Sequence, residues 1–589
     1  MSAIVLVIAA ACIYVLAYRF YGAFIAAKVL VLDESRKTPA YQYENGYDYV
    51  PTNKWIVFGH HFAAIAGAGP LVGPVLAAQF GYLPGALWIL IGAVVAGAVH
   101  DIVVLFASVR HDGLSLIEIS KREVGKLSGF CTAIAVLFIL IIAMAGLALV
   151  VVNALFNSPW GTFTVGATIP IALLMGIYMK WIRPEKVSEA TIIGVTLLIL
   201  SVIAGPYIQH SALAPFFTFN QKQMTIILAV YGFVAAALPV WLLLAPRDYL
   251  STYMKIGVVV LLAIGVIIVN PIIQMPAVTK FVNGGGPIIP GKVWPFVFIT
   301  IACGALSGFH SLVASGTTPK MIKNEKDILP IGFGAMLVEG FVAIMALIAA
   351  TSLVPGDYFA INTPPAVFAK LGMQIKDLPI LSQMVGESLA GRTGGAVTLA
   401  VGMAHIFSKI PGLGYLMSYW YHFAILFEAL FILTTIDAGT RVGRYLLQEA
   451  GGVIYKPLKD KNWWPGIIIT SAIISFAWGY LVYGGSISTI WPLFGTSNQL
   501  LGGIALAIGT NMIIRMGKAK YMWITAVPMA FLVVTTITAA YLNIVTNYLP
   551  KGNMLLVTLS AMIILLAVII VVDSVLKWFK MLKKENVTA

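Results

Sequence analysis

Charged residues and cysteines are scarce in this sequence. Only 10% of its 589 residues are charged, against about 25% in soluble domains. Hydrophobic residues make up 60% of the chain, and the mean hydropathy is +0.94. This composition excludes a soluble domain and predicts a polytopic membrane protein. The three cysteines, Cys12, Cys131 and Cys303, lie inside apolar segments without the spacing of a disulfide framework or a metal site.

Acidic residues are fewer than basic ones, 23 against 37, which gives a formal net charge of +14. The Lys and Arg residues lie mostly in short connections, as the positive-inside rule describes. The sequence has no basic patch with interleaved aromatics outside the apolar segments, so the expected partner is the lipid bilayer and not a nucleic acid. Lys577, Lys580, Lys583 and Lys584 predict a cytoplasmic C-terminus.

Leader and enzyme motifs are also missing. No Lys or Arg precedes the apolar stretch 1–17, so we interpret this stretch as a first transmembrane helix and not as a signal peptide. The sequence contains no His-Glu-x-x-His, no Gly-x-Ser-x-Gly and no nucleotide loop. We therefore expect no enzyme and no cofactor.

Apolar segment lengths predict an all-α fold with about sixteen transmembrane helices. The seventh crossing is expected over 225–245, the ninth over about 297–316 and the tenth over 331–353. Counting crossings from the N-terminus places Lys409 on the cytoplasmic side of the membrane, whereas counting back from the C-terminus places it outside. One segment between 351 and 441 is therefore expected to be re-entrant, split or miscounted.

One apolar stretch, 55–82, is interrupted where a spanning helix should be continuous. Gly67-Ala68-Gly69-Pro70 and Gly73-Pro74 fall near its middle, and both residue types disfavour a helix interior. Irregular backbone at membrane depth is tolerated where it faces protein or a polar cavity. The pattern predicts a discontinuous helix, with a kinked, closely packed helix as the alternative.

The second half-helix of this stretch would begin at Pro70, a favoured position for proline. The N–H groups of Leu71, Val72 and Gly73 would then point into the gap, where the helix dipole favours an anion. His61 lies close to this gap in the sequence. Pro239 interrupts the seventh crossing, which runs through the membrane in the direction opposite to the second crossing, 55–82. We predict a substrate site formed by His61, Gly67, Gly69, Pro70, Leu71, Val72, Gly73, Pro239 and His310.

Paired interrupted helices of opposite direction indicate a transporter built from inverted repeats. The spacing predicts a five-plus-five core over 55–410, with repeats at 55–210 and 222–410. A first helix and a polar connection occupy 1–54, and further transmembrane helices occupy 411–589.

Four motifs resemble the carbon starvation protein A family. They are the stretches 59–70, 307–320, 436–441 and 491–500, which begin Gly59-His60-His61, Ser307-Gly308-Phe309, Ile436-Asp437-Ala438 and Trp491-Pro492-Leu493. The resemblance covers nearly the whole chain. It implies an inner-membrane importer of pyruvate or peptides during carbon starvation, driven by protons. It also implies a core like that of the LeuT and amino acid–polyamine–organocation transporters.

Ionisable residues at membrane depth are candidates for ion coupling, because burying charge is costly. Asp101 and Glu339 are the preferred proton carriers, and each has a structural hydrogen bond or ion pair as its alternative. A hydroxyl-rich face in the ninth crossing would suit sodium or protons, or would serve helix packing. The ion-coupling candidates are Asp101, Glu339, His60, His100, Ser307, Ser311, Ser315, Thr318 and Asp437.

Other functions remain open at this point. A sodium-coupled symporter for peptides or amino acids would use Ser311 and Ser315. A membrane metalloenzyme would need four side chains to converge on a metal, those of His60, His61, His100 and Asp101. A channel would not need paired interrupted helices, and a receptor would need a partner. The sequence does not give the oligomeric state.

Overall fold

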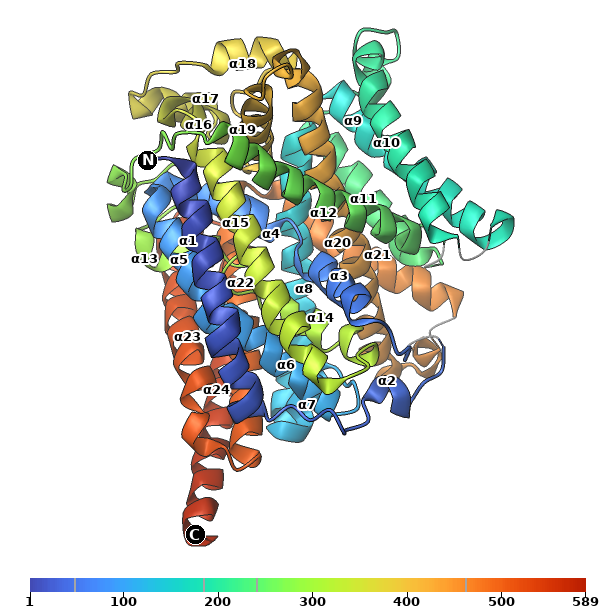
Figure 1. Cartoon of the computed structure of the whole chain (residues 1–589), viewed down its shortest axis with the longest axis vertical. Helices are drawn as coiled ribbons and strands as arrows, with labels where there is room; N and C mark the ends of the chain where they lie inside the picture. Colours follow the sequence, from blue (N-terminus) through green and yellow to red (C-terminus); the bar gives the residue numbers. More distant parts are fainter. Residues whose placement is uncertain (47–48, 184–185, 240–241, 461–462, 589) are drawn as a thin grey trace. The chain divides into compact units, whose positions relative to one another are not determined.

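The computed structural model describes residues 1–46, 49–183, 186–239, 242–460 and 463–588. Helices form the regular framework of these residues (Figure 1), which confirms the all-α class. Eleven helices among them are long and apolar enough to cross a membrane, or up to twelve if one bent pair counts as a span. The predicted number of about sixteen crossings is therefore too high.

Part of the excess comes from apolar segments that fold into helices shorter than a typical crossing. A straight crossing needs about 20 residues, and apolar length does not show where a helix ends. These short helices contain 17, 8, 6 and 13 residues. They are α11 (Gln221–Ala237), α13 (Val293–Thr300), α14 (Phe309–Ala314) and α19 (Ala396–Ser408). The last of them lies between 351 and 441, where alternation had failed.

The chain divides into two compact units, each assembled from separate stretches. We call Val5–Ile139, Ala277–Ile344 and Pro492–Ala589 the site unit, and Met1–Ile4, Leu140–Pro276 and Met345–Trp491 the companion unit. Besides its short helices, the site unit contains most of α1 (Ala3–Leu16) and the whole of α2 (Pro39–Gln42), α3 (Lys54–Ile65), α4 (Gly69–Ala77), α5 (Tyr82–Gly92), α6 (Ala98–Arg110), α7 (Leu116–Glu123), α23 (Trp523–Asn543) and α24 (Met554–Thr588).

The companion unit contains the longest helix of the chain's described part. Its helices, besides α11 and α19, are α9 (Pro159–Ile177), α10 (Val187–Gln209), α12 (Leu244–Val269), α16 (Pro355–Asn362), α17 (Pro365–Phe368), α18 (Leu378–Val385), α20 (Met417–Ile454) and α21 (Trp464–Gly484). Four helices belong partly to each unit: α1, whose first two residues fall in the companion unit, α8 (Lys126–Leu155), α15 (Ala335–Thr351) and α22 (Ile487–Arg515).

The predicted interruption near Pro70 is confirmed. Helix α3 begins after Asn53, whose side chain accepts a hydrogen bond from the Trp55 amide, a normal N-cap arrangement. The helix ends at Ile65, and α4 starts at Gly69 with Pro70 in its first turn. The helical axis bends by 45° across the break. Glycine and proline in the sequence thus mark the break correctly.

A second interruption lies where a continuous ninth helix was expected. Helix α13 ends at Thr300 and α14 begins at Phe309, with irregular backbone over 301–308. The prediction of one helix over about 297–316 is therefore wrong. It relied on apolar composition, and no proline lies between the two ends of the break.

The two interruptions pack against each other inside the site unit. A Cβ atom at Gly73 would lie 2.6 Å from the Thr300 carbonyl oxygen, and one at Gly69 would lie 2.2 Å from Cys303 Sγ. Real Cβ atoms do not approach other atoms so closely. Glycine at both positions is therefore required for the broken segments to meet.

A further gap separates α11 from α12 in the companion unit. Helix α11 ends at Ala237, Pro239 is exposed, and α12 begins at Leu244. The proline break predicted for the seventh crossing is therefore present. Val240 and Trp241, part of the same predicted motif, lie outside the described residues.

Candidate functional site

Side chains from two neighbouring helices satisfy the backbone of the second interruption. Trp88 of α5 donates its indole N–H to the Ile301 carbonyl at 3.0 Å. Gln499 of α22 donates to the carbonyls of Phe298 and Leu306, both at 3.1 Å. Backbone groups freed at membrane depth need such partners, because lipid supplies none.

Asn498 performs the same task at the start of α14. Its side-chain oxygen accepts from the Phe309 amide at 2.8 Å. Its amide also contacts the Ser307 hydroxyl at 3.0 Å. Both Asn498 and Gln499 therefore satisfy polar groups of the second break.

A chain of buried ionisable side chains lies beside these breaks. His310 of α14 has Nδ1 2.9 Å from Asp101 Oδ2 and Nε2 3.1 Å from Glu339 Oε2. The other Asp101 oxygen lies 2.7 Å from Nδ1 of His100. All four side chains are fully buried. Helices α6, α14 and α15 thus bring together both preferred proton carriers and two predicted histidines.

These contacts set how many protons the cluster holds. His310 is hydrogen-bonded to Asp101 through Nδ1 and lies within ion-pair distance of Glu339 through Nε2. A protonated His310 ring would place one positive charge between two carboxylates. With His100 neutral, the cluster then has a formal charge of −1. A buried net charge is costly, and one additional proton would make the cluster neutral.

The two adjacent histidines of α3 face different surroundings. His61 is buried, with Nδ1 2.9 Å from the Thr318 hydroxyl. Its Nε2 and that of His100 are buried and meet no hydrogen-bond partner among the described residues. His60 is exposed and contacts the Thr317 hydroxyl at 3.1 Å. His61 therefore offers a polar atom to a small bound molecule or water near the first break.

The predicted hydroxyls go to separate partners. Ser307 contacts Asn498, and Thr318 contacts His61. Ser311 donates to the Gly308 carbonyl at 2.6 Å. Ser315 donates to the Ser311 carbonyl at 2.6 Å and accepts from the Leu116 amide at 2.9 Å. The last contact attaches α7 to the end of α14.

The start of α4 is more fully engaged than the sequence suggested. The amides of Leu71 and Val72 donate to the Ala68 carbonyl at 3.1 and 2.9 Å. An anion at this helix N-terminus would have to share these donors. Gly67, whose amide donates to the Ile65 carbonyl at 2.7 Å, lies in the break itself.

Two predicted residues belong to the companion unit. Asp437 of α20 is buried and accepts a hydrogen bond from the Tyr231 hydroxyl at 2.6 Å. Arg247 of α12 lies 3.5 Å from the same carboxylate oxygen. Arg441 of α20 donates to the Ala235 carbonyl at 2.7 Å. Pro239, the other predicted residue, lies exposed in the same unit.

Sequence reasoning missed another buried polar cluster in the companion unit. Glu387 and Arg392 line a cavity of about 270 Å³. Glu387 accepts from the Ser158 hydroxyl at 2.5 Å, and burial raises the pKa of its carboxyl. In the sequence, the only sign of this cluster is an acidic and a basic residue five positions apart. The same pattern is common in surface loops, so it does not indicate a buried pair.

The chain matches known proteins over most of its length. The family model described as carbon starvation protein CstA matches residues 2–539. Peptide transporter CstA of Bacillus subtilis (strain 168) is 55% identical over 591 residues, which cover 100% of this chain and 98% of that protein. Pyruvate/proton symporter BtsT of Escherichia coli (strain K12) is 50% identical over 579 residues, covering 91% of this chain and 81% of that protein. Both names describe transporters, not enzymes.

This chain is similar to one solved structure of a manganese transporter. That structure is the Eremococcus coleocola protein in complex with an aromatic bis-isothiourea substituted compound. The match is 13% identical with a TM-score of 0.45, and it covers 91% of this chain and 98% of that one.

Proposed function

Because the chain belongs to the carbon starvation protein CstA family, we propose that it is a proton-coupled importer of a small carboxylate-bearing nutrient. The substrate class is pyruvate or a short peptide, in keeping with the printed names of two relatives. The protein would act in the inner membrane by alternating access, with its C-terminus in the cytoplasm.

The observation that carries this proposal is the position of His310 between two buried carboxylates. Ionisable chains of this kind at membrane depth serve as proton relays. The cluster has room for one more proton before it reaches neutrality. Loading that proton would remove a buried charge, and releasing it would restore the charge, so proton binding would bias the packing of α6, α14 and α15.

The interrupted helices supply the second part of the proposal. The break at 66–68 lies in the proposed repeat 55–210, and the break at 301–308 lies in the proposed repeat 222–410. Irregular backbone near the midplane is where transporters bind substrate. We place the substrate carboxylate beside the break near Gly67, with the buried Nε2 of His61 as the side-chain atom offered to it.

Uptake of labelled pyruvate into proteoliposomes tests this proposal directly. An inward proton gradient should drive accumulation, and an unlabelled dipeptide should leave that accumulation unchanged if pyruvate is the substrate. In the Glu339→Gln variant, the proton gradient should no longer drive pyruvate accumulation. The matched control is Glu118→Gln, at an exposed position on α7, which should transport normally.

Other outcomes redirect or overturn the proposal. If the dipeptide inhibits pyruvate uptake and is itself accumulated, the substrate class is peptide. Accumulation driven by a sodium gradient alone, with no response to protons, would contradict proton coupling.

A further inference from the structure

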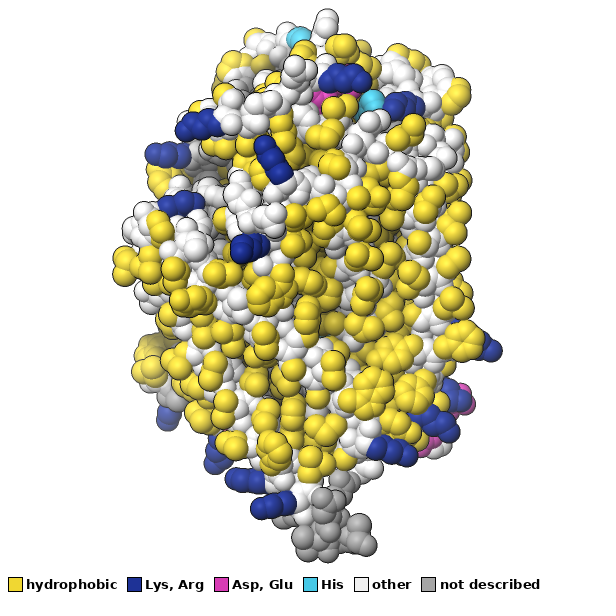
Figure 2. Space-filling model, turned by 90° about the vertical axis from the view of Figure 1, so that its left-hand side faces the viewer, with side chains coloured by type: hydrophobic (Ala, Val, Ile, Leu, Met, Phe, Trp, Pro, Cys, Tyr) yellow, Lys and Arg dark blue, Asp and Glu magenta, His cyan; other side chains and the backbone are white. Residues whose placement is uncertain are grey.

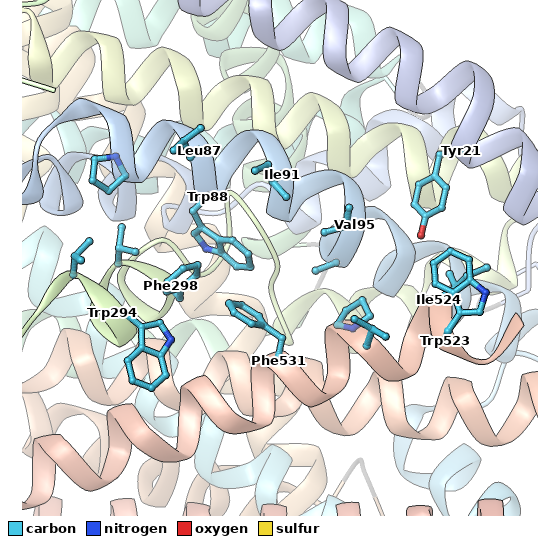
Figure 3. A pocket seen from close by; sticks show the side chains of 16 residues that line it. Tyr21, Leu87, Trp88, Ile91, Val95, Trp294, Phe298, Trp523, Ile524 and Phe531 are labelled. Atoms are coloured by element: carbon cyan, nitrogen blue, oxygen red, sulfur yellow. The ribbon is translucent and has the colours of Figure 1, made fainter. Parts of the chain in front are cut away.

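An apolar groove lies on the site unit, and no residue of the ionisable cluster lines it. Its volume is about 770 Å³, and every lining residue is apolar or aromatic. Figure 3 shows side chains from α5, α13 and α23 arranged along it, with Tyr21 near one end. Volumes of about 300–1,000 Å³ are typical of small-molecule sites.

The groove opens toward the membrane. Three lining residues, Leu87, Ile91 and Val527, are 48%, 55% and 63% exposed. They belong to membrane-spanning helices at Tyr82–Arg110 and Trp523–Tyr548. Hydrophobic side chains cover much of the face in Figure 2, and Lys and Arg gather toward its two ends. The medium at the groove mouth is therefore the hydrocarbon of lipid tails.

The groove floor is connected to the second interrupted helix. Phe298 of α13 packs against Trp88, with ring centroids 4.8 Å apart, and against Phe531 at 5.2 Å. The same Trp88 donates to the Ile301 carbonyl at the start of the break. Whatever occupies the groove therefore packs on the half-helix that ends at the second break.

The dimensions favour a hydrocarbon chain over a protein helix. A helix about 10 Å across has a cross-section of about 80 Å². A volume of 770 Å³ would hold only about 10 Å of such a helix, or about two turns. A membrane helix from a second copy would need far more room, whereas an acyl chain is thin and flexible.

Residues at one end of the groove suit a lipid headgroup. Tyr21 and Trp523 lie there (Figure 3), and such residues favour the headgroup level of a bilayer. The short helix 519–521 precedes Trp523, and its Lys520 is exposed. Lys518 lies just before it. Clustered lysines beside a membrane helix attract anionic headgroups.

We propose that this groove binds one acyl chain of an anionic phospholipid, whose headgroup contacts Lys518 and Lys520. The bound chain packs on Trp88 and Phe298 and so supports α13 beside its break. Binding of the lipid does not depend on the proposed transport function.

Lipid retention measures this site directly. The full-length protein is reconstituted in vesicles of phosphatidylcholine and phosphatidylglycerol, extracted in mild detergent and examined by native mass spectrometry. Wild type should retain one phosphatidylglycerol per chain. Val527→Trp places a larger side chain in the groove and should lose that lipid.

The matched control is Val534→Trp on the same helix. Val534 is 58% exposed and does not line the groove, so this variant should keep the lipid. If Val527→Trp does not fold, Ile91→Trp fills the groove from α5 and should also lose the lipid. Equal retention by wild type, the folded groove variant and Val534→Trp would overturn the proposal.

The headgroup contact has its own test. Changing Lys518 and Lys520 together to Gln should remove the preference for phosphatidylglycerol while some phosphatidylcholine remains bound. An unchanged preference would overturn the headgroup assignment. A wild type that retains no lipid, but forms a dimer that Val527→Trp dissociates, would assign the groove to a second copy and overturn the proposal.

Discussion

The ring of His310 lies between two carboxylates that the chain brings from distant positions. Its two nitrogens contact Asp101 and Glu339 at 2.9 and 3.1 Å. Removing one member of a buried ion pair leaves an uncompensated charge, which costs about 3–5 kcal/mol. His310 is therefore expected to stabilise the site unit, in addition to its proposed role in proton transfer.

His310→Gln should lower the free energy of unfolding by about 3–5 kcal/mol. Adding Glu339→Gln should recover part of this loss, because one buried carboxylate then no longer lacks a countercharge. Thermal unfolding in detergent of wild type, both single variants and the double variant measures the coupling. Strictly additive losses would contradict the ion pair.

His111, at the end of α6, provides a pH-dependent contact outside the membrane. Its Nε2 lies 2.9 Å from Glu123, which also pairs with Arg515. The hydrogen bond to Glu123 raises the pKa of His111 above its usual 6.5. The protonated ring is favoured in the folded state, so its stabilisation is present below 6.5 and is lost as the pH rises through the raised pKa.

His111→Gln should therefore lower the melting temperature most at acid pH. The difference from wild type should shrink as the pH rises above 6.5, and a pH series of melting curves in detergent measures it. Lys121→Gln, at an exposed position on α7, serves as the control and should show no such trend. A difference that grows with pH would contradict the assignment.

Sequence reasoning located the buried ionisable residues but not their partners. Asp101 and Glu339 stand out because charge at membrane depth is costly. His310 was assigned to the substrate, and its contact with Asp101 joins residues 209 positions apart. Local patterns contain no information on such a pairing, because helix packing creates it.

At the scale of elements, the two interrupted helices meet through glycine. Gly73 allows α4 to approach the Thr300 carbonyl of α13, whereas Gly59 of α3 has no atom within 4 Å of an added Cβ. Alanine is preferred over glycine in a helix by about 1 kcal/mol. The same substitution should therefore have opposite effects at the two positions.

Gly73→Ala should destabilise the protein by about 1–3 kcal/mol, the usual cost of overpacking. Gly59→Ala should be neutral or stabilising by about 1 kcal/mol. Thermal unfolding of both variants in detergent makes the comparison. Equal destabilisation would mean that the close packing of the breaks is incorrect.

Only one of these two breaks was predicted. Gly67-Ala68-Gly69-Pro70 disfavours a helix by its own chemistry. The break at 301–308 has no proline and is defined by side chains from other helices, chiefly Trp88, Asn498 and Gln499. A segment whose irregular backbone is satisfied from a distance resembles an ordinary apolar helix in sequence.

For the whole molecule, charge distribution predicts the orientation in the membrane. Lys577, Lys580 and Lys583 at the end of α24 predict a cytoplasmic C-terminus. The two units, however, each combine three stretches of chain, and composition does not reveal such interleaving. The repeat boundaries at 55–210 and 222–410 stay a prediction.

A single cysteine at Lys583 tests the orientation. Lys583→Cys in a Cys12→Ser background should react with a membrane-impermeant maleimide in inside-out vesicles and not in intact cells. The Cys12→Ser background alone is the control, since Cys131 and Cys303 are buried. Labelling in intact cells would show that the C-terminus lies outside and would contradict the predicted orientation.

Proton movement coupled to substrate entry tests the central claim most directly. A pH-sensitive dye inside proteoliposomes reports proton influx when pyruvate, or a dipeptide, is added outside. Wild type should acidify the lumen, and Glu339→Gln should exchange substrate without acidification. Acidification by Glu339→Gln at the wild-type rate would show that the Asp101–His310–Glu339 cluster does not carry the coupled proton.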